Sequence, residues 1–514
     1  MTISMNNMSR LLGNLSSRLL LALICGGIMP FAFAPWGYLV AAVIALTGLI
    51  LLIQGTHPVR IAYVFGLGWF GFGAWWLAPT FHTYGGLPWW LASLVVLLVG
   101  AILACFPALW IWGCRKLADA SQQTYALLIL LPSGIIFEEW LRGHLFTGLP
   151  WTALGNLLLG TPAVGWLSIL GVYGGAALPV LLAASLAALL TASQRKLGSI
   201  GFFFIALITL ASPSITIPET SPINVALVQP NTPQDHKWDS DFLNGIMHDL
   251  TALSQSSAAQ VDLMVWPEAA VPLYLKESPT WDQWLTAQMR EWHTPVLFGG
   301  LQYFPRTQTS QTGLYLFDEH RAERNFVGKH HLVPFGEYVP EWLPWLHKIV
   351  PDIGDFRPAD DSGVLSHPLG IFGSLICYES IFPEEARARA LAGADVLILV
   401  TNDAWYGTSP AAWQHFQAAQ ARAVETGRYV LRSANTGITA IIAPNGHITQ
   451  RLPWWQKGVL MGTYQPITRQ TFYSLWGDFT ALLIGAVGVL GLGITIIMNR
   501  HKRSHHRLST EIKR

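Results

Sequence analysis

Eight apolar stretches constrain the fold of this chain more than any other feature, because each is long or nearly long enough to cross a lipid bilayer. About 20 apolar residues in a helix span the roughly 30 Å hydrocarbon layer, and a helix satisfies its own backbone hydrogen bonds there. The fifth stretch is short and contains Pro132. The sequence therefore predicts an α-helical membrane bundle of eight spans, at residues 13–33, 36–54, 61–79, 88–112, 124–137, 163–191, 198–214 and 478–498.

Charged residues divide the chain in the same way. Asp, Glu, Lys and Arg make up 12% of the sequence, about half the usual share in soluble proteins. Residues 1–214 contain 11 of these side chains, whereas residues 215–514 contain 50. A net charge of +1 gives no reason to expect nucleic acid, whose binding needs a concentrated basic face. The partner predicted from composition is the lipid bilayer.

The positions of Lys and Arg predict the orientation of the spans, because short cytoplasmic loops carry an excess of these residues. With the N-terminus inside, Arg142 is the only basic residue in the short loops left outside. Both termini are then cytoplasmic, and the segment between the seventh and eighth spans is extracytoplasmic. The predicted domains are a seven-helix membrane domain (1–214), an outer domain (215–477), and an eighth helix with a basic tail (478–514).

Two features of the membrane domain have alternative interpretations. The first span could be a cleaved signal peptide, because Ala32-Phe33-Ala34 resembles a cleavage site, although Pro35 directly after it disfavours cleavage. The segment 138–151 is expected to be an outer loop that is unusually rich in charge. Its polar residues are either an ion-pair cluster at the membrane interface or a contact with lipid headgroups: Glu138, Glu139, Arg142 and His144.

From residue 221 onward, short β-branched runs alternate with amphipathic stretches, which is typical of an α/β domain. The predicted strands are 223–230, 261–269, 295–303, 313–318, 371–379, 394–403 and 438–444. The predicted helices lie near 240–255, 280–292, 382–392 and 411–427. The loop 334–358 is rich in Pro and Trp. Its aromatic residues either pack on the core or form a lid that dips into the bilayer.

Cys377 is the one cysteine of the predicted outer domain, since the other three, Cys25, Cys105 and Cys114, fall within or beside spans. Without a second cysteine, an oxidising compartment cannot close it into a disulfide within the domain. Cys377 ends the apolar run 371–376 and precedes a predicted helix. Open α/β sheets place their ligands at such strand ends, so we predict that Cys377 is a nucleophile.

Two other polar residues have a related setting. Glu268 ends a buried run, where a carboxylate needs a partner, and Lys329 precedes the strand-like HLVPFGE and supplies a matching cation. Glu268 is predicted to take the thiol proton as general base. Lys329 and the backbone N–H of Tyr378 are predicted to stabilise an oxyanion. Together with Cys377, these groups predict acyl transfer.

A cysteine–histidine pair is the main alternative to this arrangement. His330 and His331 adjoin Lys329, and His415 lies further along the chain, so an imidazole could serve as the base instead. No metal site is expected, because the sequence has neither HExxH nor a paired-cysteine spacing. No other cofactor is expected either.

Four motifs occur in order along the predicted outer domain: WPEAAVP (266–272), GKHHLVPFGEYVP (328–340), ICYES (376–380) and TNDAWYG (401–407). They resemble the motifs of the nitrilase superfamily. With seven spans before them and one after, the chain is similar to the membrane-embedded branch of that superfamily, the apolipoprotein N-acyltransferase family. The resemblance implies an αββα sandwich for the outer domain. It also implies a bacterial inner-membrane location with this domain on the periplasmic side.

The resemblance implies roles for individual residues. Glu268 is the base, Lys329 stabilises the oxyanion and Cys377 is the nucleophile. Four further residues are implied to support them: Glu337 beside the base or the lysine, Tyr378 and Glu379 in the pocket beside the cysteine, and Trp238 in a mobile loop near the site.

The implied reaction has two stages. The cysteine first takes an acyl chain as a thioester from a phospholipid, typically phosphatidylethanolamine. The α-amine of an apolipoprotein's N-terminal diacylglyceryl-cysteine then accepts the chain as an amide. A monomer is expected. Moving a 16-carbon chain into water costs on the order of 12 kcal/mol at about 0.8 kcal/mol per methylene, which explains why such an enzyme needs spans.

Two other functional classes remain open at this point. The outer domain could be a tethered nitrilase-like amidase or esterase that acts on a small amide or ester. The helices could alternatively belong to a transporter with an appended binding domain, although the spans contain few of the ionisable residues that mark transport paths.

Overall fold

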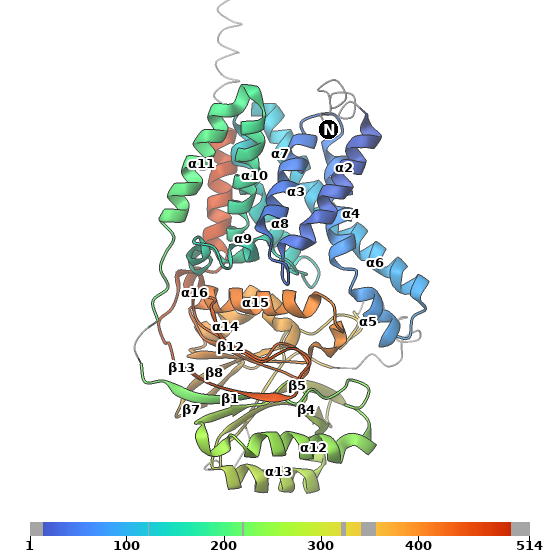
Figure 1. Ribbon diagram of the computed structural model, residues 1–514, viewed down its shortest axis with the longest axis vertical. Helices are drawn as coiled ribbons and strands as arrows, with labels where there is room; N and C mark the ends of the chain where they lie inside the picture. Colours follow the sequence, from blue (N-terminus) through green and yellow to red (C-terminus); the bar gives the residue numbers. More distant parts are fainter. Residues whose placement is uncertain (1–13, 122, 218–219, 320–324, 341–355, 495–514) are drawn as a thin grey trace, which may run out of the picture. The chain divides into compact units, whose positions relative to one another are not determined.

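The computed structural model of the chain describes residues 14–121, 123–217, 220–319, 325–340 and 356–494 (Figure 1). Most of the loop 334–358, the end of the eighth predicted span and the basic tail lie outside the described residues. The chain divides into two compact units. The first contains the helices up to His82, Leu87–Pro213 and the helix after Asp478, and the second contains Thr83–Gly86 and Ser214–Gly477.

The first unit is helical. Its α-helices are α2 (Leu15–Ile28), α3 (Leu39–Leu52), α4 (Pro58–Gly73), α5 (Leu77–Thr83), α6 (Trp89–Leu103), α7 (Cys105–Ser121), α8 (Ala126–His144), α9 (Leu167–Gly175), α10 (Ala177–Leu190) and α11 (Arg195–Leu210). Glycine lets α2 and α4 approach closely, since a Cβ on Gly26 would lie 1.9 Å from the Phe65 carbonyl oxygen. Large apolar side chains such as Leu97, Phe203 and Leu207 are at least half exposed on the outer faces, as expected of a surface that contacts lipid.

The helices of this unit are consistent with membrane spans but do not fix their number. Among the described residues, two helical segments are long and apolar enough to cross a membrane, Leu15–Ala32 and Trp89–Ser121. Up to four segments qualify if each of two bent helix pairs counts as one span. Shorter apolar helices cover Leu39–Leu52 and Phe479–Ile494. The count of eight spans stays a prediction.

The expected outer loop at 138–151 is wrong in its first half, because α8 continues to His144. The Arg142 guanidinium lies 2.8 Å from the Glu139 carboxylate, and both side chains are buried within the unit. Arg142 also donates to the backbone carbonyls of Leu149 and Trp151, at 2.6 and 3.0 Å. A charge that is paired and hydrogen-bonded in this way can remain inside a helical segment, so charge alone was a poor marker of the helix end.

The second unit contains two β-sheets (Figure 1). The first has the order β13-β1-β2-β4-β5-β6, with β3 beside β4, and the second has the order β12-β11-β10-β9-β8-β7. The strands of the first sheet are β1 (Ile223–Gln229), β2 (Leu263–Val265), β3 (Val271–Tyr274), β4 (Val296–Phe304), β5 (Thr309–Phe317), β6 (Asn325–Gly328) and β13 (Gly458–Tyr464). Those of the second are β7 (Val364–His367), β8 (Gly370–Ile376), β9 (Val396–Thr401), β10 (Val430–Ala434), β11 (Ala440–Ile442) and β12 (Ile448–Arg451).

Helices cover the outer face of each sheet, so the unit has four layers in the order αββα (Figure 1). Leu227 of β1 and Ile398 of β9 lie in the apolar layer between the sheets. The next residue of β1, Val228, points the other way and joins the core beneath α12 (Ser240–Gln255) and α13 (Pro279–Trp292). Leu399 joins Phe416 beneath α14 (Pro383–Leu391) and α15 (Ala411–Thr426). Burial of alternate residues on both faces produces the sandwich and confirms the predicted α/β architecture.

Strand direction determines where loop residues can meet. β1, β2 and β4 are parallel, and β6 regains their direction through two antiparallel pairings. β8, β9 and β10 are parallel in the second sheet. The carboxyl ends of these strands therefore share one edge in each sheet. Glu268 and Lys329 follow β2 and β6, while Cys377 and Asn402 follow β8 and β9.

All seven predicted strands overlap observed ones, and the four predicted helices of this unit agree with α12 to α15 within one residue. Six strands were missed, namely β3, β6, β7, β10, β12 and β13. The strand expected after Lys329 is also wrong: Lys329 follows β6, and HLVPFGE is irregular apart from an isolated bridge between Pro334 and Tyr338. The two prolines and the glycine near this stretch favour a turn over a strand.

The layer between the sheets predicts a difference between two substitutions. Ile398→Ala removes a fully buried side chain and should lower the free energy of unfolding by about 2–5 kcal/mol. Leu391→Ala, at the end of α14, removes a side chain that is 47% exposed and should have a much smaller effect. The midpoint of thermal unfolding of the purified full-length chain in detergent compares the two. Equal midpoints would contradict this description of the core.

Candidate active site

Cys377 lies directly after β8, at the first position of a short 3-10 helix, Cys377–Ile381. Its φ angle is 52°, a left-handed conformation that residues other than glycine rarely adopt. The residue is 7% exposed. A sharp turn at the end of a buried strand projects the side chain from the sheet edge, and residues in this conformation cluster at functional sites.

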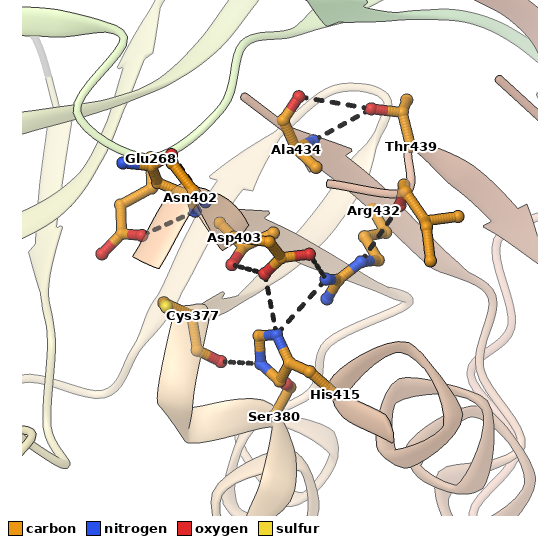
Figure 2. A network of polar contacts seen from close by, with 12 residues as sticks. Glu268, Cys377, Ser380, Asn402, Asp403, His415, Arg432, Ala434 and Thr439 are labelled. Atoms are coloured by element: carbon orange, nitrogen blue, oxygen red, sulfur yellow. Dashed lines mark hydrogen bonds and ion pairs between the residues drawn. The ribbon is translucent and has the colours of Figure 1, made fainter. Parts of the chain in front are cut away.

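Glu268 lies three residues beyond β2 and faces Cys377. Its carboxylate accepts a hydrogen bond from the backbone N–H of Asn402 at 2.9 Å (Figure 2). It also lies close enough to the Cys377 thiol for the two groups to shift each other's pKa. The buried Lys237 ammonium donates to the Glu268 backbone carbonyl at 2.9 Å. β4 passes very close, since a Cβ on Gly299 would lie 2.6 Å from the Glu268 Cα. The backbone of the carboxylate is therefore fixed from two sides.

Lys329 completes the group and is 1% exposed. Its ammonium donates to one oxygen of Glu337 at 2.7 Å. The other oxygen of Glu337 accepts from the Val333 backbone N–H at 2.7 Å. Glu337 thus holds the lysine ammonium while it is itself held by the loop, and its supporting role stays a prediction.

The charges of these residues shift one another's protonation. Burial raises the pKa of the Cys377 thiol, and the Glu268 carboxylate raises it further, so the thiol retains its proton at neutral pH. Burial also raises the pKa of Glu268, although Lys329 opposes the rise. For Lys329, burial favours the neutral form, but Glu337 and Glu268 outweigh it and the pKa is raised. The site therefore combines a protonated thiol, a carboxylate with increased proton affinity and a permanent cation.

Glu379 links the two segments that carry the lysine and the cysteine. One of its oxygens accepts from the backbone N–H of His330 at 2.6 Å, and the other accepts from that of Ile376 at 2.7 Å. Its side chain is fully buried. Since His330 follows Lys329 and Ile376 precedes Cys377, this carboxylate holds both residues at a fixed separation.

The histidines of the cysteine–histidine alternative have other partners. His330 Nε2 lies 3.1 Å from Asp361, and the His331 ring stacks on Phe382 with centroids 3.7 Å apart. His415 Nε2 lies 2.9 Å from the backbone carbonyl oxygen of Cys377 (Figure 2). The Glu268 carboxylate interacts with the thiol itself, since each group shifts the other's pKa, and this favours the carboxylate as the base.

Two predicted residues flank this group. Tyr378 is 9% exposed, and its ring packs edge-on against Phe382 with centroids 5.0 Å apart. Trp238 lies in the turn before α12 and is 53% exposed. The residue before it, Lys237, is the one that reaches Glu268. The roles of Tyr378 and Trp238 stay predictions.

Sequence reasoning missed Lys237 and Asn402 as parts of the site. Asn402 lies in the TNDAWYG motif and contacts Glu268 through its backbone N–H, which leaves no signal in the residue type. Lys237 adjoins the predicted Trp238, and only its burial distinguishes it from a surface lysine. That burial lowers its pKa to about 8, against the opposing influence of Glu268 and Cys377.

Among the described residues, no three His, Cys, Asp or Glu side chains are placed to hold a metal ion.

Comparison with known proteins places this site in a family. Residues 224–472 match the carbon-nitrogen hydrolase family, and residues 25–185 match the apolipoprotein N-acyltransferase N-terminal domain. The apolipoprotein N-acyltransferase of Ralstonia nicotianae is 35% identical over 505 residues, which cover 91% of this chain and 92% of the relative. This chain belongs to the apolipoprotein N-acyltransferase family.

Other relatives extend the comparison. The apolipoprotein N-acyltransferase of Methylococcus capsulatus is 35% identical over 506 residues, covering 95% of this chain and 98% of the relative. Among solved structures, Saccharomyces cerevisiae Nit3, a member of the nitrilase superfamily, aligns with 49% of this chain and 93% of its own at 20% identity and a TM-score of 0.38. The family membership confirms the resemblance that the sequence motifs indicated.

The bridging role of Glu379 predicts that Glu379→Gln impairs the site. An amide offers one acceptor oxygen where the carboxylate offers two, so one of the two segments loses its hydrogen bond. Alkylation of Cys377 by iodoacetamide should slow by about tenfold, because a charge-assisted hydrogen bond contributes about 1.5–3 kcal/mol. Glu291→Gln, on the exposed face of α13, is the matched control and should react as wild type does. An unchanged rate in Glu379→Gln would show that the bridge does not position the thiol.

Proposed function

We propose that this chain transfers an acyl chain from a membrane phospholipid to the α-amino group of the N-terminal diacylglyceryl-cysteine of an apolipoprotein. The observation that carries the proposal is the meeting of Glu268, Lys329 and Cys377 at one buried site in a member of this family. Glu268 acts as base, Cys377 as nucleophile, and Lys329 stabilises the oxyanion. Glu337 orients Lys329, and Tyr378, Glu379 and Trp238 shape the surroundings.

In the first stage, Glu268 removes the proton from the Cys377 thiol as sulfur attacks the ester carbonyl carbon. Negative charge develops on the carbonyl oxygen, and the Lys329 ammonium stabilises it. The bond from this carbon to the glycerol oxygen then breaks. The leaving oxygen takes the proton back from Glu268, and the products are a thioester and a lysophospholipid.

In the second stage, the apolipoprotein amine attacks the thioester carbon, and Glu268 accepts a proton from the nitrogen. The carbon–sulfur bond breaks, the amide forms, and the thiolate recovers its proton from Glu268. The enzyme returns to its starting state, which gives ping-pong kinetics. The base acts in both stages because each begins with loss of a proton from the attacking group.

The proposal includes a location and a domain plan. Eight spans cross the bacterial inner membrane, with residues 1–214 and 478–514 containing the spans and a cytoplasmic tail. Residues 215–477 form the catalytic domain on the periplasmic side, and both termini are cytoplasmic. Phosphatidylethanolamine is the donor and the enzyme is a monomer. The distribution of basic residues supports this orientation, and the cost of exposing an acyl chain to water supports a site that both lipid substrates reach from the bilayer.

A covalent adduct tests the first stage. The purified full-length chain, incubated in detergent with phosphatidylethanolamine that carries a palmitoyl group at sn-1, should gain the mass of one acyl group on Cys377. Cys377→Ala should gain none, and Cys114→Ala, in α7 of the other unit, should react normally. Glu268→Gln should slow adduct formation by about 10²–10⁴-fold and Lys329→Met by about 10²–10³-fold. Wild-type protein that stays unmodified, or releases only free fatty acid, would favour the tethered esterase instead.

The raised pKa of Glu268 predicts how the rate of adduct formation falls on the acid side of its pH profile, here called the acid limb. The base must be ionised, so the rate of adduct formation should fall as pH decreases through the Glu268 pKa. Because burial raises that pKa, the loss should occur at a higher pH than the ordinary value of a glutamate, about 4.3. Single-turnover rates across pH measure the limb, and Glu268→Gln should lack it. A limb that persists in Glu268→Gln would assign it to another group.

A further inference from the structure

A buried polar network lies behind the candidate nucleophile and is used by none of the steps above. His415 of α15, Asp403 after β9 and Arg432 of β10 point toward one another (Figure 2). His415 Nδ1 lies 3.0 Å from one oxygen of Asp403, and Arg432 Nη2 lies 2.6 Å from the other. All three residues are at most 1% exposed. Burial acts to raise the pKa of Asp403, but Arg432 and His415 lower it to about 2, so the carboxylate is charged.

The second nitrogen of His415 connects this network to the nucleophile. Nε2 lies 2.9 Å from the backbone carbonyl oxygen of Cys377 and 2.7 Å from the Ser380 hydroxyl. A carbonyl oxygen only accepts hydrogen bonds, so Nε2 is the donor in its contact with Cys377. The contact is made to the backbone of Cys377, whereas Glu268 interacts with its side chain.

A bond to this carbonyl oxygen fixes more than one atom. The peptide between Cys377 and Tyr378 is planar, and its C=O and N–H groups point in opposite directions. When His415 holds the oxygen, it also sets the direction of the Tyr378 N–H, the group expected to assist Lys329 at the oxyanion. It further stabilises the left-handed backbone of Cys377, whose φ is 52°. Such a conformation persists only where the surroundings enforce it.

Helix α15 also holds the 3-10 helix that begins with Cys377. A glycine at position 437 leaves space for the Asp403 carboxylate. Arg422 of α15 donates to the backbone carbonyls of Ser380 and Ile381, at 3.3 and 2.9 Å. A Cβ on Gly437 would lie 2.0 Å from the Asp403 carboxylate, so a glycine is required where the chain passes this carboxylate. These contacts connect α15 and the strand ends to the 3-10 helix that begins with Cys377.

We propose that His415, oriented by Asp403 and Arg432, is a positioning residue that holds the Cys377–Tyr378 peptide in the orientation needed for acyl transfer. His415 does not touch the substrate and exchanges no proton in the reaction. The proposal rests on the proposed function, since it assumes that Cys377 is the nucleophile. Its rival is a direct role for the imidazole as base.

Two side-chain amides separate these roles. The amide nitrogen of Gln reaches the position of His Nε2 and can donate to the Cys377 carbonyl oxygen, whereas that of Asn reaches only the position of Nδ1. Neither amide can act as a base. In the full-length chain, His415→Gln should therefore form the palmitoyl adduct from phosphatidylethanolamine at least ten times faster than His415→Asn. His447→Gln, at an exposed position, is the matched control and should react as wild type does.

Alkylation by iodoacetamide provides the second readout, because it needs the thiol but no oxyanion donor. Each His415 variant should keep an alkylation rate within fivefold of wild type, while adduct formation by His415→Asn falls by about 100-fold. A merely structural role would reduce both rates together. Rates of adduct formation in His415→Gln and His415→Asn that differ by less than tenfold would overturn the proposal, as would a parallel loss of alkylation.

The outcomes distinguish this proposal from the proposed function. Absence of an adduct in wild type contradicts the function, whereas a wild-type adduct with equally slow Gln and Asn variants contradicts only the role of His415. Monodispersity in size-exclusion chromatography identifies the variants that fold. If His415→Asn does not fold, His415→Gln decides alone: adduct formation within tenfold of wild type supports the proposal, and a folded His415→Gln below that rate overturns it.

Discussion

The ion pair between Lys329 and Glu337 is the interaction on which the rest of the site depends. A buried ammonium is costly unless it is paired and hydrogen-bonded, and Glu337 meets both needs at 2.7 Å. The cation can then act on two further groups. It limits the rise in the pKa of Glu268, which keeps that carboxylate available as a base, and it opposes the rise in the pKa of Cys377. Without Glu337, burial would favour the neutral form of Lys329 more strongly, and the positive charge acting on Glu268 and Cys377 would be weakened.

The sandwich brings these residues together through strand direction. Glu268 and Lys329 come from one sheet, Cys377 comes from the other, and each follows a strand whose carboxyl end lies at the site. Glu379 then connects the lysine segment to the cysteine strand through backbone N–H groups. The separation of these three side chains is thus set by sheet packing and one carboxylate, and less by the loops in which the residues lie.

Much of this arrangement could be predicted from the sequence, because strand ends after apolar runs indicate where polar residues project. Glu268 and Cys377 were predicted in that way, Lys329 was predicted as a matching cation, and the family motifs added Glu337. The network behind Cys377 could not be found by pattern. α15 was predicted as an amphipathic helix, yet its polar residues His415 and Arg422 are almost fully buried. Their partners come from distant strands and turns. Polar residues that are buried against one another do not follow the regular spacing of apolar residues by which a buried face is recognised in a sequence.

The pairing of charged side chains near Cys377 bears on why the site should transfer an acyl group to an amine instead of hydrolysing the thioester. A thioester survives until the amine arrives only if water is excluded. Charged groups left unpaired would retain water. Near Cys377, Lys329 is paired with Glu337, and Asp403 is paired with Arg432 and His415. The oxygens of Glu379 are likewise occupied by backbone N–H groups. Charges paired in this way can stabilise a developing oxyanion while they attract less water than unpaired charges would.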